Sequence, residues 1–172
     1  YAVLPANHDP ERARDDGTPL LHGDLDPVVS RIANPARNLA AELHGEHGDV
    51  EAGLREADAV VRGRWQTQRV SHVALETHAC VGWVDGDGRL VLRTSSQVPF
   101  LVRDEIAHVF GLEREAVRGF TARVGGGFGG KQEILTEDLV ALAVLATGRP
   151  VAYEMTRTEE LTVAPCRHPF RV

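Results

Sequence analysis

The residues with the clearest capacity for chemistry lie at positions 124–132, where the sequence reads Val-Gly-Gly-Gly-Phe-Gly-Gly-Lys-Gln. Five of the six residues from Gly125 to Gly130 are glycines, and ordering them costs backbone entropy. That cost makes sense where the main chain passes very close to a ligand or adopts angles that a Cβ forbids. If a helix follows the loop, the unpaired amides at its start favour anionic oxygens. The pattern therefore predicts a loop that binds an oxygen-rich ligand through its backbone.

Two generic nucleotide-binding patterns fit this loop only in part. Residues 125–131 match the G-x-x-x-x-G-K phosphate loop, but Gln132 stands where that motif needs a hydroxyl for Mg²⁺. The glycines also match the G-x-G-x-x-G dinucleotide pattern, and Glu154 lies near where an acid would hold a ribose. Residues 120–124 alternate polar and apolar, whereas the first strand of a dinucleotide fold is buried on both faces. A tight turn without a ligand is a third interpretation, although Phe128 is unusual in a turn.

The elements that position the loop follow from hydrophobic periodicity and turn residues. The Asp-Gly-Asp-Gly sequence at 85–88 separates two apolar runs, which is typical of a hairpin. Asp49 can cap one helix, while Gly111 and Gly148 stand where two longer helices should end. The expected strands are 59–67, 80–84, 90–94, 117–124 and 151–155, and the expected helices are 50–57, 98–110 and 134–146. This order favours an α+β fold with a mixed β-sheet and packed helices.

Length and composition exclude several classes of protein. The chain has 172 residues, of which 42% are hydrophobic and 26% charged, as in ordinary globular domains. A formal net charge of −6 argues against nucleic acid or an anionic membrane as a partner, because both need a basic face. No apolar run approaches the roughly 20 residues that span a bilayer. The two cysteines, Cys80 and Cys166, lie far apart, so we expect a reducing cytoplasmic location, with Cys80 in the core.

The ends of the chain and its first third predict a fragment that joins two domains. The sequence starts at Tyr1 without an initiating Met and stops at Val172 in mid-pattern. Residues 9–34 are rich in Pro, Gly, Asp and Arg without sustained periodicity, which is typical of a long surface connection. We therefore expect one part at residues 1–48 and another at residues 49–172.

Residues 125–131 closely resemble the molybdenum-cofactor loop of the molybdenum hydroxylases, the xanthine dehydrogenase and aldehyde oxidase family. Further segments resemble parts of the same molybdenum-binding subunit in the same order, namely 75–78, 94–97, 147–151 and 167–170. The resemblance implies that residues 1–48 are the tail of the hammerhead domain plus a connecting segment. Residues 49–172 would be the first part of the molybdenum-cofactor-binding domain.

The resemblance also implies a set of cofactor-binding residues. Phe128 would bring its backbone beside an oxo ligand of the metal, with Gly127 and Gly129 permitting the close approach. Gln97 matches a glutamine whose amide can donate to an oxygen ligand. No residue of this chain is expected to coordinate the metal directly, and the catalytic glutamate of the family is expected outside this chain.

Gln132 is the expected substrate-binding residue and also a departure from part of the family. Xanthine-oxidising members carry a glutamate at the matching position, whereas an amide offers a donor and an acceptor without a carboxylate. This difference puts xanthine in doubt and leaves aldehydes, N-heterocycles and carbon monoxide-type chemistry open. Gln132 as a helix-start residue without substrate contact is the other interpretation.

Cofactors and partners follow from the resemblance as well. The family predicts a molybdenum-pterin cofactor in its dinucleotide form, with 2Fe-2S clusters and FAD on other domains or subunits, and a dimer of the full assembly. The expected enzyme hydroxylates aldehydes or N-heterocycles with water as the oxygen source, and the isolated fragment is expected to be inactive. A nucleotide-binding module for NAD or ATP, and an assembly domain that has lost its cofactor, are the alternatives.

Overall fold

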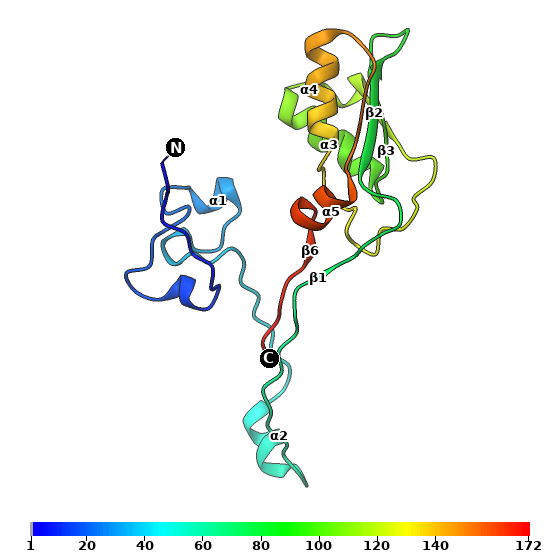
Figure 1. The fold of residues 1–172 in the computed structure, drawn as a ribbon. Helices are drawn as coiled ribbons and strands as arrows, with labels where there is room; N and C mark the ends of the chain where they lie inside the picture. Colours follow the sequence, from blue (N-terminus) through cyan, green and yellow to red (C-terminus); the bar gives the residue numbers. More distant parts are fainter. Residues whose placement is uncertain (1) are drawn as a thin grey trace. The chain divides into compact units, whose positions relative to one another are not determined.

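The computed structural model describes residues 2–172, which form two compact units that divide between Val61 and Arg62 (Figure 1). The first unit contains only short elements, namely η1 (Arg12–Arg14), α1 (Pro27–Ser30), η2 (Pro35–Arg37) and α2 (Val50–Glu56). The predicted cap of α2 is confirmed, because the Asp49 side chain accepts a hydrogen bond from the Ala52 amide at 2.9 Å. Much of this unit is the irregular connection that the sequence predicts.

The second unit is built on a four-stranded mixed sheet with the strand order β4-β3-β2-β5. Its strands are β2 (Ala79–Val84), β3 (Leu90–Thr94), β4 (Val117–Phe120) and β5 (Val151–Glu154). β2 and β3 form the predicted hairpin, with Gly82 opposite Leu92. β5 runs antiparallel to β2, while β4 runs parallel to β3. Together with the helices, this mixed sheet confirms the α+β prediction.

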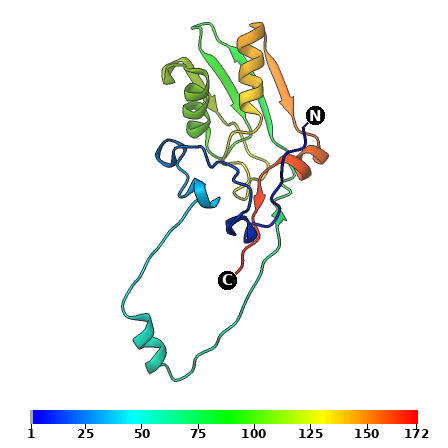
Figure 2. The same ribbon diagram turned by 90° about the vertical axis from the view of Figure 1, so that its left-hand side faces the viewer.

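Two helices pack on the sheet and form the core (Figure 2). They are α3 (Pro99–Phe110) and α4 (Glu137–Thr147), which end at Gly111 and Gly148 in the left-handed conformation, as predicted. The buried apolar side chains of this core are Cys80, Leu90, Leu92, Val102, Ile106, Ala107, Val117, Val140, Ala141 and Val144. Cys80 therefore lies in the core as expected, and burial, with a smaller contribution from the Glu137 charge, raises the pKa of its thiol to about 12.

One predicted strand is wrong, and so are the predicted end of another strand and the predicted start of a helix. Residues 59–67 are exposed and form no strand. Their one pairing is an isolated bridge between Gln66 and Arg171, flanked by backbone hydrogen bonds from the Trp65 amide to the Val172 carbonyl and from the Thr67 amide to the Phe170 carbonyl. β4 ends at Phe120, which pairs with Arg93 as the last residue of its register with β3, and not at residue 124 as predicted. α4 begins three residues later than expected, because the Glu137 carboxylate accepts from the Leu135 and Thr136 amides and holds them outside the helix. The glycine loop consequently lies several residues before a helix, not at its first turn.

Two further elements lie near the end of the chain. α5 (Arg157–Val163) starts at a capping box in which Thr156 and Glu159 satisfy each other's amides. β1 (Val70–Ser71) and β6 (Cys166–Arg167) form a separate two-stranded ribbon. Among the helices in residues 2–172, none is both long and apolar enough to cross a membrane.

Candidate functional site

The glycine loop contains a strained turn at its centre. The Gly130 amide donates to the Gly127 carbonyl at 2.8 Å, and the two residues between them, Phe128 and Gly129, have φ values of +53° and +88°. Positive φ at both central positions is the pattern of a type I′ turn, which favours Gly, Asn and Asp. A Phe in this conformation costs about 1–2 kcal/mol because its Cβ crowds the backbone. Since the Phe128 ring is 75% exposed, packing does not explain the conformation, and such strain is typical of functional sites.

Gln97 holds this turn in place. Its Oε1 accepts from the Gly129 amide at 3.1 Å and the Lys131 amide at 3.3 Å, and its backbone N–H donates to the Lys131 carbonyl at 2.8 Å. A Cβ on Gly127 would overlap the Gln97 carboxamide, so a side chain is excluded there by Gln97 itself. The structure therefore brings Gln97, Gly127, Phe128 and Gly129 together, while their role toward a cofactor stays a prediction.

The side chain of Lys131, at the end of the loop, is buried, and its ammonium group donates three hydrogen bonds. It is 1% exposed, and its Nζ donates to the Glu76 carbonyl at 2.9 Å, to Glu76 Oε2 at 2.9 Å and to Ser95 Oγ at 2.7 Å. It is also the sole lysine in a sequence that otherwise uses arginine. Three acceptors around one nitrogen suit a compact ammonium and not a planar guanidinium, which explains this exception.

Glu76 joins Lys131 to the start of the loop. Its Oε2 accepts from the Gly125 amide at 2.7 Å and from the Ser95 hydroxyl at 2.6 Å. Burial alone would raise the pKa of this carboxyl, but hydrogen bonds from Ser95, Gly125 and Lys131 and the Lys131 charge lower it. An anionic Glu76 therefore fixes the beginning of the loop, while Gln97 fixes its end.

His78 supports the loop from a different side. Its Nε2 lies 3.0 Å from the Gly130 carbonyl oxygen, and its Nδ1 lies 2.9 Å from Glu160 Oε2 on α5. The side chains of both residues are 7% exposed. Burial would raise the pKa of Glu160, but hydrogen bonds from the His78 ring and backbone amide, followed by the nearby positive charges, lower it.

A second strained residue lies beside the loop. Val73 has a φ of +46°, which is rare for a β-branched side chain, and it is largely exposed. Its neighbour Ala74 approaches the loop so closely that a Cβ on Gly126 would lie 3.3 Å from the Ala74 Cβ. The segment that carries Glu76 and His78 thus runs alongside the glycine loop and forms one wall of the site.

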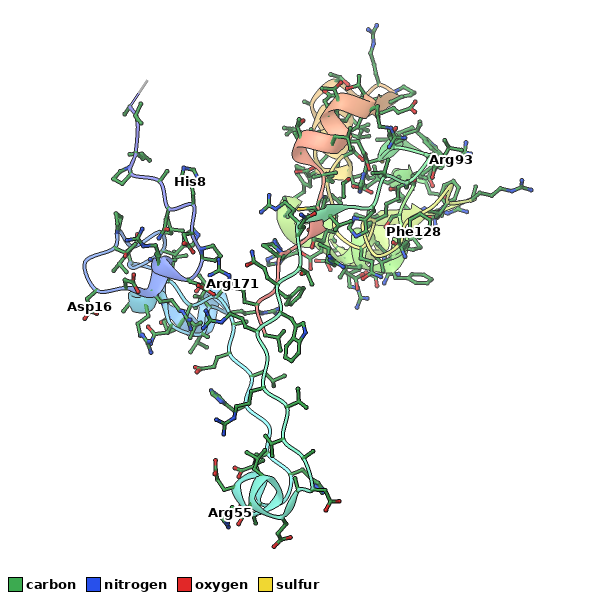
Figure 3. All side chains as sticks on the ribbon, turned by 60° about the horizontal axis from the view of Figure 1, so that its bottom comes forward. His8, Asp16, Arg55, Arg93, Phe128 and Arg171 are labelled. Atoms are coloured by element: carbon green, nitrogen blue, oxygen red, sulfur yellow. The ribbon has the colours of Figure 1, made fainter. Side chains whose placement is uncertain are left out.

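The exposed surface of the turn offers hydrogen-bond donors. Within residues 2–172 the backbone amide of Phe128 has no hydrogen-bond partner. The Gln97 side chain uses only its Oε1 atom toward the loop, so its Nε2 group remains available as a donor. Figure 3 labels Phe128 on this loop. Gln132 follows the buried Lys131, and its side chain is exposed. In the described part of the chain, no group of three or more His, Cys, Asp or Glu side chains could hold a metal ion.

The geometry does not support the nucleotide-binding alternative. A phosphate loop needs its lysine to reach the phosphates, but the Lys131 ammonium is buried and fully bonded to Glu76 and Ser95. Both nucleotide patterns also need a helix directly after the glycines, whereas α4 begins only at Glu137.

Four residues that build the site were not among the predicted site residues, namely Glu76, His78, Lys131 and Glu160. The isolation of Lys131 as a single lysine was a readable signal, and Glu76 and His78 stand together in the Leu-Glu-Thr-His segment. Glu160 gave no local signal, because it reaches His78 from 82 positions away.

The chain is similar to a known protein family and to several known proteins. The family model of the molybdopterin cofactor-binding domain matches residues 32–172. The chain is 40% identical over 146 residues to the probable hypoxanthine oxidase XdhD of Escherichia coli (strain K12), covering 85% of this chain and 15% of that protein. It is 35% identical over 160 residues to the nicotinate dehydrogenase large molybdopterin subunit of Eubacterium barkeri, covering 93% of this chain and 35% of that subunit.

A solved structure with the same fold is the aldehyde oxidoreductase from Desulfovibrio gigas. It superposes with a TM-score of 0.66 and 29% sequence identity over 71% of this chain and 14% of that protein. This chain therefore spans about a third or less of the length of the proteins that it matches.

Proposed function

Since the chain belongs to the molybdopterin cofactor-binding family, we propose that the protein carrying it is a molybdenum-dependent hydroxylase of the xanthine dehydrogenase and aldehyde oxidase type. The proposed reaction hydroxylates an N-heterocycle or an aldehyde with water as the oxygen source. Relatives named for hypoxanthine and nicotinate support the heterocycle, and the structural relative named for aldehydes supports the second class.

The strained turn at residues 127–130 is the observation that carries this proposal. The Phe128 amide and the Gln97 carboxamide would donate hydrogen bonds to oxygen ligands of the molybdenum-pterin cofactor. Gly127 and Gly129 would keep side chains away from that contact. When bound, the cofactor supplies the oxidation chemistry, whereas these four residues bind and orient it. The left-handed conformation of Phe128 would then serve to direct its backbone amide toward the cofactor.

Gln132 is proposed to contact the substrate. Its exposed carboxamide can donate one hydrogen bond and accept another, which suits a heterocycle that carries both a ring nitrogen and an N–H or carbonyl group. Because it lacks a carboxylate, it would not favour substrates that need a negative charge or a proton acceptor at this position.

The rest of the enzyme is proposed by analogy with the family. The proposal places the catalytic glutamate outside this chain, and 2Fe-2S clusters and FAD on partner domains or subunits that receive the electrons. It further includes the dinucleotide form of the pterin, a dimer of the full assembly and a cytoplasmic location. Residues 1–48 would end the hammerhead domain, and residues 49–172 would begin the molybdenum-cofactor-binding domain.

The experiment that tests the proposed function uses the complete purified protein. Molybdenum and pterin content are measured first, followed by oxidation of nicotinate, hypoxanthine and an aromatic aldehyde with an artificial electron acceptor. We expect about one molybdenum per subunit and turnover of at least one substrate, with no turnover by residues 1–172 alone. A folded protein without molybdenum or pterin would contradict the proposal.

A further inference from the structure

One peptide unit of the loop, between Gly130 and Lys131, is held from both of its sides. Its carbonyl oxygen lies 3.0 Å from His78 Nε2, and its amide donates to Gln97 Oε1 at 3.3 Å. The same Gln97 oxygen accepts from the Gly129 amide at 3.1 Å. Rotation of this peptide would therefore remove one of the two amide hydrogen bonds that orient the Gln97 carboxamide and leave only the Gly129 amide to hold it.

The His78 ring is itself fixed by Glu160. Nδ1 lies 3.0 Å and 2.9 Å from the two Glu160 oxygens, and the His78 backbone amide donates to Oε2 at 3.0 Å. Both ring nitrogens thus face acceptors, a carboxylate and a carbonyl, so both contacts are hydrogen bonds when both nitrogens carry a proton. The resulting ion pair is compensated within the site, which is what burial of two charged groups requires.

Other charged or titratable groups lie close to this pair. Lys131 is near enough for its charge to act on Glu160, and it pairs with Glu76. His72 lines the same small pocket as His78 and Glu160, and a Cβ on Gly130 would come within 2.7 Å of His72 Nδ1. These groups lie around the Gly130–Lys131 peptide together with His78 and Glu160. Among residues 2–172, however, only His78 lies within hydrogen-bonding distance of the Gly130 carbonyl oxygen.

We propose that His78, oriented by Glu160, is a positioning residue for the cofactor contacts of the loop. It fixes the Gly130 carbonyl, which fixes the Lys131 amide on Gln97, and Gln97 in turn holds Gly129 and the strained Phe128 turn. The cofactor part of this inference rests on the proposed function, whereas the effect on the loop does not. His78 itself touches neither the cofactor nor the substrate in this account.

Two substitutions at the same position separate this role from simple core packing. His78→Gln places an amide nitrogen near the position of Nε2, so it keeps a donor for the Gly130 carbonyl and loses the Nδ1 contact. His78→Asn places its amide near Nδ1, so it keeps the Glu160 contact and loses the Gly130 hydrogen bond. If His78 served only to pair with Glu160 in the core, His78→Asn would be the milder change.

The test measures amide hydrogen exchange and pterin content in the holoenzyme. For His78→Asn we expect exchange in residues 125–132 to rise about 5- to 10-fold, as for the loss of one hydrogen bond. Exchange in β2 and β3 should not change, and the enzyme should retain less pterin after gel filtration. His78→Gln should raise loop exchange clearly less than His78→Asn and retain more pterin, because it keeps the donor to the Gly130 carbonyl, and the exposed His108→Asn serves as the control.

Glu160→Gln provides a variant in which the histidine remains. It should raise exchange in the loop by a similar factor, because the ring loses its orienting carboxylate, while the exposed Glu105→Gln should have no effect. Equal behaviour of His78→Asn and His78→Gln, or faster exchange spread evenly over β2 and β3, would overturn the inference. A loosened loop in a protein that never contains pterin would instead refute the proposed function and leave the loop positioning intact.

Discussion

Replacement of Lys131 by arginine tests how strictly the pocket below the loop selects an ammonium group. The charge is conserved, but the shape is not, because a planar guanidinium replaces a compact group with three hydrogens. The pocket leaves Lys131 only 1% exposed, and its three acceptors lie 2.7–2.9 Å from a single nitrogen. A guanidinium therefore has to push aside Glu76 or Ser95.

The expected magnitude follows from these contacts. Each lost hydrogen bond costs about 1 kcal/mol net, and insertion of extra volume into a packed site costs about 1–3 kcal/mol. If the guanidinium retains one or two of the three bonds, the loop is destabilised by about 2–5 kcal/mol. Because about 1.4 kcal/mol is a factor of ten, local opening becomes about 30- to 4000-fold more frequent.

Hydrogen exchange of residues 125–132 in the purified holoenzyme measures this opening directly. The exposed Arg149→Lys, which makes the reverse exchange in the same unit, is the matched control and should be neutral. Protection of the loop in Lys131→Arg equal to that of the wild type would refute the reasoning, because it would show that the three acceptors do not require an ammonium.

Three further predictions concern the same loop. Phe128→Asn should stabilise the pterin-free protein by about 0.5–1 kcal/mol, since Asn tolerates a positive φ better than Phe; a lower melting temperature would contradict this. Gly127→Ala should reduce the molybdenum content of the purified protein about tenfold, because the added Cβ overlaps the Gln97 side chain. Gly86→Ala, where the added Cβ meets open space, should leave the molybdenum content unchanged. Equal molybdenum content in the two variants would contradict the proposed site. The pKa values of Glu76 and Glu160 lie below their ordinary 4.5, so their charged forms stabilise the loop above pH 4.5, and this contribution is lost as the pH falls through the lowered values. Hydrogen exchange of the loop, corrected for its intrinsic pH dependence, should therefore become faster on acidification. An exchange rate that does not change with pH after this correction would contradict the prediction.

The sheet and its two main helices could be predicted from local patterns. The Asp-Gly-Asp-Gly turn and the two helix-ending glycines act within a few residues, so they fix the β2–β3 hairpin and the ends of α3 and α4 without help from the rest of the chain. The start of α4 could not be predicted in the same way, because the Glu137 side chain competes for the amides of residues that otherwise suit a helix.

The site was predictable only where its residues lie in a contiguous motif. The glycines and Phe128 stand next to each other, and Gln97 was found through resemblance to a family. The contacts that hold them come from Glu76 and Glu160, which reach the loop and His78 across 49 and 82 positions. Such long-range hydrogen bonds leave no periodic signal, and the α5 capping box at Thr156 is the sole local sign of the helix that carries Glu160.

The most direct measurement of the central claim is the structure of the complete holoprotein with its cofactor bound. The account predicts that the Phe128 amide and the Gln97 carboxamide each lie within hydrogen-bonding distance of an oxygen ligand on the molybdenum centre, with Phe128 still at a positive φ. A loop that faces solvent, far from the pterin, or a Phe128 that relaxes to a negative φ beside the cofactor, would contradict it.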